Sequence, residues 1–190
     1  MDTKAKVKIG RFSRGGVARG RRCVAAADHD MHPDAVLAPA GILEVDRHQL
    51  NLVFGTSRDT SDFVADCLDR WWSKRRLAYP DVDRLLIDLD NGPEIASSRT
   101  PYHSKYNRVE RCWGILENHW NGALLDSIPA TLEWAKTMTW CGVRPKVHLL
   151  ERDYPTGVRI IPRLFRPIAA RLHRSTLLPK WSLVIYPRRE

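Results

Sequence analysis

The alternation of apolar and polar residues predicts a strand at the start of the chain. In residues 2–9, Ala5, Val7 and Ile9 fall on one face and three lysines fall on the other. A period of two is typical of a half-buried strand. The glycine- and arginine-rich residues 11–22 that follow predict a basic turn or hairpin tip.

Further apolar runs predict more deeply buried strands. The stretch from residue 35 to 57 holds two such runs, of which 50–55 is the stronger, with a turn at 45–49 between them. Residues 84–90 form a continuous apolar run that ends in Asp90. A run of this type is typical of a strand that is covered on both faces.

Helical periodicity predicts three helices, within residues 59–76, 107–121 and about 129–140. Thr60 or Ser61 is suited to cap the first helix, because a hydroxyl can accept a hydrogen bond from a free backbone N–H of the first turn. The second helix has a clear apolar stripe. That stripe consists of Val109, Trp113, Leu116 and Trp120.

The order strand, strand, strand, helix, strand, helix indicates an α/β domain with a mixed sheet. We expect this catalytic region to cover residues 1–125. Residues 126–190 are expected to be helical at first and then irregular, basic and rich in proline.

The charge of the chain favours a polyanionic partner. Its 190 residues include 31 Lys and Arg against 22 Asp and Glu, a formal net charge of +9. Nucleic acid is the commonest partner for such a balance. A generally basic, solvated surface is the alternative interpretation. The residues that we expect to follow a DNA backbone are Lys4, Lys6, Lys8, Arg11 and Arg14.

The cysteines and the hydropathy indicate a cytoplasmic protein. The cysteines at 23, 67, 112 and 141 form no C-x-x-C pair, which argues against a zinc ribbon. No apolar run reaches the ~18 residues that a membrane span needs. We therefore expect reduced thiols, no membrane and no secretory signal.

Three acidic residues stand where a sheet could gather them. Asp2 begins the first strand, Asp90 ends the buried strand, and Glu110 lies in the first turn of the tryptophan-rich helix. Carboxylates are the ligands that Mg²⁺ prefers, and two such ions can promote phosphodiester cleavage. Spacing alone leaves a plainer role open, because such acids are also common turn formers and helix caps.

Several long motifs of the chain resemble the DDE transposases of bacterial insertion sequences, in the ISAzo-like group. The resemblance runs from residue 2 to about 160. It is carried by "DTKAKVKIGRFSRGG", "AAADHDMHPDA", "LLIDLDNGPE", "PYHSKYNRVERCWGILENHWNGALLDS" and "AKTMTWCGVRPKV". It implies an RNase H-like fold. It also implies an enzyme that cuts DNA at the element ends and joins the freed 3′ hydroxyl to target DNA.

The resemblance also implies a site of three carboxylates that hold two Mg²⁺ ions, with Mn²⁺ as a substitute. The Asp-Asp-Glu triad falls on Asp2, Asp90 and Glu110, with Asp88 as the rival for the second position. Element ends and target DNA would be the partners, and a homo-oligomer is a further possibility. We expect Glu117, on the same face of the helix as Glu110, to make a supporting ionic contact.

The chain departs from the family pattern in two places, which predicts a truncated and internally deleted copy. Asp2 directly follows Met1, whereas the family carries an end-binding region before its first Asp. The family also has a helix and an edge strand where this chain has only "IASSRT". Two alternatives therefore stay open: a catalytically inactive, basic DNA-binding remnant, or a small metal-dependent nuclease.

Overall fold

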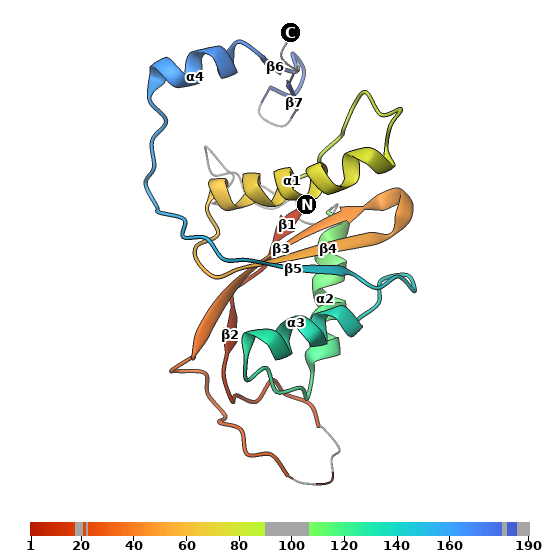
Figure 1. Cartoon of the computed structure of the whole chain (residues 1–190), viewed down its shortest axis with the longest axis vertical. Coiled ribbons are helices and arrows are strands. Elements are labelled where there is room, and N and C mark those ends of the chain that lie inside the picture. Colours follow the sequence, from red (N-terminus) through yellow and green to blue (C-terminus); the bar gives the residue numbers. More distant parts are fainter. Residues whose placement is uncertain (18–20, 22, 90–106, 180–181, 186–190) are drawn as a thin grey trace. The chain divides into compact units, whose positions relative to one another are not determined.

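The computed structural model describes residues 1–17, 21, 23–89, 107–179 and 182–185 (Figure 1). The chain forms two compact units, Met1–Pro155 and Thr156–Glu190. The first unit contains the sheet and the two described candidate carboxylates, Asp2 and Glu110.

The first unit is built on a mixed sheet. Its strands are β1 (Asp2–Thr3), β2 (Val7–Ile9), β3 (Ala35–Glu44), β4 (Gln49–Gly55) and β5 (Lys146–Leu150). Both β1 and β2 pair antiparallel with β3, which pairs antiparallel with β4, and β5 adds to β4 in parallel. The predicted mixed α/β architecture is thus confirmed, and its order is compatible with an RNase H-like fold.

The predicted strand at residues 2–9 is interrupted. Val7 and Ile9 are buried and Lys8 is exposed, as the alternation predicts. Residues 4–6 leave the ladder, however, and Ala5 is exposed instead of buried. The result is two short strands that pair with different parts of β3.

The central hairpin forms as predicted. The turn between β3 and β4 contains the short helix η1 (Val45–Arg47) and closes at His48, whose φ is 51°. In this hairpin, strand β3 is ten residues long, because the apolar run continues through Pro39 and Gly41 without a break.

The three predicted helices are confirmed, and each starts at a polar cap. They are α1 (Ser61–Arg75), α2 (Arg108–Trp120) and α3 (Ile128–Thr137). The side chains of Thr60, Asn107 and Ser127 accept hydrogen bonds from backbone N–H groups in the respective first turns. A short helix, η2 (Arg76–Ala78), continues from the end of α1.

Helices cover both faces of the sheet (Figure 1). One core packs the stripe of α2, together with α3, against the face that carries Leu50, Leu52 and Phe54. The other core packs α1 against the opposite face, which carries Ala40 and Val53. The α2 side chains that were predicted to be buried are 0–7% exposed.

The predicted buried strand at 84–90 is wrong for the residues that the structure describes. No strand forms at residues 84–89, and Leu86 is 95% exposed. A strand needs a long ladder beside it, and β1 covers only two residues. Asp90, at the end of the run, lies outside the described residues.

Strand β5 was not predicted. It lies in the segment after α3 and extends the sheet beyond β4, so the first compact unit reaches Pro155. The predicted boundary near residue 125 is the end of the catalytic region, which is a different quantity from the end of a compact unit. It stays a prediction.

The second unit contains regular structure where an irregular tail was expected. It has one helix, α4 (Pro162–Ala169), and a small antiparallel pair, β6 (Leu172–Arg174) with β7 (Leu183–Ile185). Pro162 begins α4. Proline suits a first helical turn because its missing N–H has no partner there in any helix.

Candidate active site

Two side chains of α2 fasten this helix to the first residues of the chain. Asn107, the N-cap residue, donates from Nδ2 to the carbonyl oxygen of Met1 at 3.0 Å. Trp113 donates from Nε1 to Oδ2 of Asp2 at 2.8 Å. Both bonds are buried, where hydrogen bonds are less exposed to competition from water.

Glu110 lies between these two contacts. It is three residues after Asn107 and three residues before Trp113. At ~1.5 Å of rise per residue, it is about 4.5 Å along the helix axis from each of them. Residues three apart share a face of a helix, so Glu110 starts from the side of α2 that meets Asp2. The two contacts therefore fasten the turns of α2 on either side of Glu110 to the strand start that carries Asp2.

The segment before Asp90 reaches the same region. The backbone nitrogen of Met1 donates to the carbonyl oxygen of Asp88 at 2.7 Å. The rival candidate Asp88 has an exposed side chain. Among the described residues, no three side chains of His, Cys, Asp or Glu converge as a metal site would require. Asp88 therefore does not complete a triad with Asp2 and Glu110 here.

The donor set suits a hard divalent cation. Asp2 is 5% exposed and Glu110 is half-buried, so both carboxylates are partly shielded from water. Mg²⁺ and Mn²⁺ accept carboxylate oxygens together with water. Asp2 and Glu110 are thus ligands of the type that the expected metal prefers, and Asp90 lies outside the described residues.

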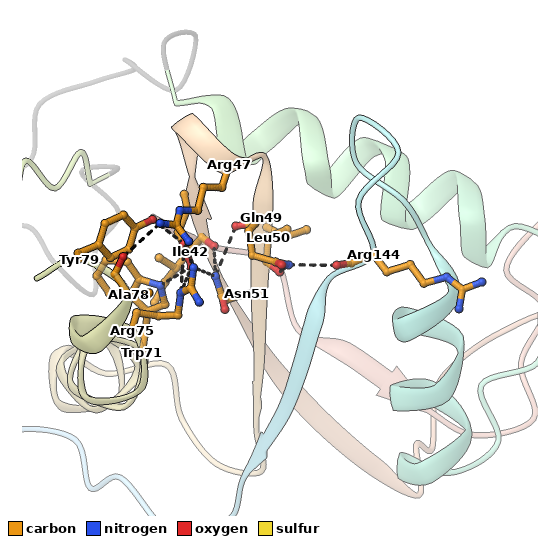
Figure 2. Close-up of polar contacts among 11 residues, drawn as sticks. Ile42, Arg47, Gln49, Leu50, Asn51, Trp71, Arg75, Ala78, Tyr79 and Arg144 are labelled. Atoms are coloured by element: carbon orange, nitrogen blue, oxygen red, sulfur yellow. Dashed lines mark hydrogen bonds and ion pairs between the residues drawn. The ribbon is translucent and has the colours of Figure 1, made fainter.

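A second buried carboxylate, Glu44 at the end of β3, was missed by the sequence analysis. Its Oε2 forms an ion pair with Nη2 of Arg75 at 2.7 Å. Three further groups donate to the same carboxylate: Trp71 Nε1, Tyr79 Oη and Asn51 Nδ2. Figure 2 shows these side chains gathered at the end of the β3–β4 hairpin beside α1. The available signal was an acid that closes an apolar strand, in the same position as Asp90.

The hydrogen bonds keep Glu44 ionised. Burial raises the pKa of its carboxyl group, but the bonds from Arg75, Trp71, Tyr79 and Asn51 together outweigh burial and lower the pKa from 4.5 to about 2. The network joins β3 to α1 and η2, so it supports the sheet rather than taking part in chemistry.

The free energy of unfolding should therefore decrease as the pH is lowered, because Glu44 becomes protonated. In the unfolded chain this group takes up a proton near its ordinary pKa, whereas in the folded chain it does so only near pH 2. Its stabilising contribution is present above about pH 4.5 and is lost as the pH falls to about 2. We expect a loss of about 3 kcal/mol over that range.

Urea unfolding at a series of pH values measures this contribution. The variant Glu44→Gln has no charge at this position and should show a shallower dependence on pH than the wild type. Equal slopes for the two proteins between pH 5 and pH 2 would show that Glu44 titrates normally in the folded state.

A cavity of about 560 Å³ is lined by residues of the Glu44 network and by residues near the candidate site. Its wall includes Glu44 and Tyr79 together with Met1, Asp88 and Asn107. The residues before Asp88 border this cavity and do not extend the sheet, which is consistent with their exposure.

The lysines predicted to bind DNA are each paired with an acid. The pairs are Lys4 with Glu117, Lys6 with Asp59 at 3.3 Å, and Lys8 with Asp30 at 3.1 Å. The contact of Glu117 confirms its expected ionic role. A phosphate would have to compete with these carboxylates for the lysines, so their DNA contact stays a prediction.

The two predicted arginines differ in their surroundings. Arg11 is exposed, whereas the guanidinium group of Arg14 donates to the carbonyl oxygen of Lys8 at 2.7 Å and lies 5.7 Å from the ring centre of Trp120. Burial is the main cause of a lowered pKa at Arg14. Arg11 is therefore the better placed of the two to meet a phosphate.

The other ligand-type residues have ordinary roles. The side chains of Asp28, His29, Asp30 and His32 are exposed, as expected for a polar loop. His119 shares a hydrogen bond with Thr137 at 2.8 Å, which links α2 to α3. His103 lies outside the described residues.

All four cysteines are free thiols. Burial raises the pKa of Cys67 and Cys112 to about 12, so both behave as small apolar groups. Within the described part of the chain, no helix has both the length and the apolar character that crossing a bilayer requires.

The first unit thus has a mixed α/β sheet with helices on both faces, which is compatible with an RNase H-like fold. The model of a family described as Rhodopirellula transposase DDE domain matches residues 1–100 and 100–187. The chain therefore belongs to this family of insertion-sequence DDE transposases. No curated protein and no solved structure matches it.

Proposed function

We propose that this chain is the catalytic region of a DDE transposase that hydrolyses and joins DNA phosphodiesters with two divalent metal ions. Asp2, Asp90 and Glu110 would hold the ions. The observation that supports this proposal is the attachment of α2 to residues 1–2 through Asn107 and Trp113, which lie three residues before and three residues after Glu110.

When bound, the metal ions supply Lewis acidity and a lowered pKa for water. The residues of the chain orient and shield the reacting groups. Asn107 and Trp113 hold the two elements that carry Asp2 and Glu110, and the cores on both faces of the sheet keep this arrangement rigid. The net charge of +9 would keep the DNA backbone nearby.

We also propose that the chain is an internally deleted copy. The two family matches meet at residue 100, inside the short "IASSRT" link that stands where the family has a helix and an edge strand. An internal deletion in this chain would produce such a pair of matches. A deletion there would remove the neighbour that residues 84–90 need in order to form a strand.

A catalytically inactive DNA-binding remnant is the second candidate. The exposure of residues 84–89 favours it, because Asp90 would then follow a segment that the sheet does not support. Catalytic groups have to be held within about 0.5 Å of their productive geometry. A chain with the triad but without this support would bind DNA and cut it poorly.

A plasmid-nicking experiment tests the proposed function. Supercoiled DNA with and without the terminal repeats of the element is incubated with the protein and Mg²⁺, and EDTA is added to a matched sample. Nicking that needs both Mg²⁺ and the repeats supports the transposase. Retention of DNA on a gel without nicking supports the inactive remnant, and nicking of both plasmids supports a small nuclease.

The remaining features of the proposal are its partners and location. Element ends and target DNA would be bound, in the cytoplasm, and a homo-oligomer would allow two ends to be processed together.

A further inference from the structure

The indole of Trp113 donates a hydrogen bond to the side chain of Asp2. The bond from Nε1 to Oδ2 measures 2.8 Å, and the two residues are only 7% and 5% exposed. An indole N–H is a donor and nothing else. Trp113 therefore contributes neither a metal ligand nor a proton acceptor, and its effect on the carboxylate is orientation.

A glycine makes room for this ring. Gly41 on β3 is the ladder partner of Asp2. A Cβ atom at Gly41 would lie 2.8 Å from Cζ2 and 2.9 Å from Cη2 of Trp113, and 2.9 Å from Cγ1 of Val109. Such distances force a shift of the ring or of the helix. Glycine weakens the interior of a strand, so its presence here fits a need for close approach.

Burial of tryptophan on α2 does not by itself produce such a bond. Trp120 lies on the same stripe and is fully buried, yet its Nε1 has no hydrogen-bond partner among the described residues. The contact between Trp113 and Asp2 is thus specific to that position of the helix, one turn after Glu110.

We propose that Trp113 is a positioning residue that fixes the carboxylate plane of Asp2 for a divalent cation, and that Gly41 provides the space for its ring. This inference rests on the proposed function. A hydrogen bond to an ionised carboxylate is short and directional, so it holds one oxygen of Asp2 and thereby sets the direction of the other.

The variant Trp113→Phe tests this role, with Trp120→Phe as the matched control. Both substitutions shorten a buried tryptophan of the same helix, but only the first removes a bond to Asp2. Mn²⁺ binding, followed by electron paramagnetic resonance, should weaken about tenfold in Trp113→Phe, as is usual when a group that orients a metal ligand is lost. It should be unchanged in Trp120→Phe. The variant Gly41→Ala should weaken binding in the same direction.

A measurement on the wild-type protein, before and after Mg²⁺ is added, keeps the inference testable if a variant folds poorly. In a ¹⁵N–¹H spectrum, the indole resonance of Trp113 should move when Mg²⁺ is added to the wild type, and that of Trp120 should not. An unmoved Trp113 resonance, or equal Mn²⁺ affinity in wild type and Trp113→Phe, would overturn the inference alone. Equal weakening in both tryptophan variants would also overturn it, since it would indicate a general packing effect. Failure of the wild type to bind Mn²⁺ would overturn the proposed function together with this role.

Discussion

Replacement of Glu110 by glutamine is expected to reduce Mg²⁺-dependent nicking of DNA by about a thousandfold or more, equivalent to at least ~4 kcal/mol of the reaction barrier. Glutamine keeps the shape of the side chain and removes its charge. The side chain starts from the face of α2 that is fastened to Asp2, where a negative charge is needed to hold a cation. The same loss is expected for Asp2→Asn and Asp90→Asn.

Glu117→Gln is the matched control for this prediction. Glu117 lies on the same helix but pairs with Lys4 near the surface, with 44% of its side chain exposed. Loss of the Glu117 carboxylate leaves Lys4 available to a DNA phosphate, so this variant should nick DNA at no less than the wild-type rate. Wild-type activity in Glu110→Gln, or equal loss in both variants, would contradict a catalytic role for Glu110.

The replacement of Arg75 by alanine is expected to lower the free energy of unfolding by about 3–5 kcal/mol, which is the usual effect of removing one partner of a buried ion pair. The side chain of Glu44 is only 3% exposed, and that of Arg75 is 15% exposed. Without the guanidinium group, Glu44 keeps only the neutral donors Trp71, Tyr79 and Asn51. Urea unfolding near pH 7, followed by circular dichroism, measures the change.

Arg58→Ala serves as the control, because Arg58 pairs with Asp153 at 3.9 Å on the surface, with 55% and 82% of the two side chains exposed. Its effect should stay below about 1 kcal/mol. A similarly small effect for Arg75→Ala would show that Glu44 is well solvated without its partner and that the network contributes little to the fold.

Local periodicity predicted the helices and the central hairpin well. A helix that packs on a sheet needs one apolar face, and this pattern can be read from residues that are close in sequence. The buried stripe of α2 is an example, and it consists of Val109, Trp113, Leu116 and Trp120. The hairpin between β3 and β4 is local for the same reason, since its turn residues and its two apolar runs are adjacent in the chain.

Two segments were assigned wrongly from the sequence, because the formation of a strand depends on distant partners. Residues 84–89 have the composition of a buried strand, but burial requires a covering layer and a long neighbour, and neither property can be read from the run itself. Strand β5 is the opposite case. The sequence of Lys146–Leu150 has no clear strand pattern, yet these residues pair in parallel with β4.

The residue types of the candidate site could be predicted from the sequence, but the hydrogen bonds around it could not. Asp2 and Glu110 were chosen from their places at a strand start and a helix start, and from the family resemblance. The bonds that fasten α2 to residues 1–2 come from Asn107 and Trp113, whose partners are more than a hundred residues away in sequence. Such contacts become visible only in three dimensions.

The central claim is that Asp2, Asp90 and Glu110 meet around the same divalent ions, and iron-directed cleavage of the backbone tests it most directly. Fe²⁺ replaces Mg²⁺ in the protein, and ascorbate with peroxide then generates radicals that cut the chain close to the bound metal. Mass spectrometry of the fragments should find cuts beside all three residues, and an excess of Mg²⁺ should suppress them together. Cuts at only one of these positions, or at the loop that carries Asp28 and His32, would contradict the account.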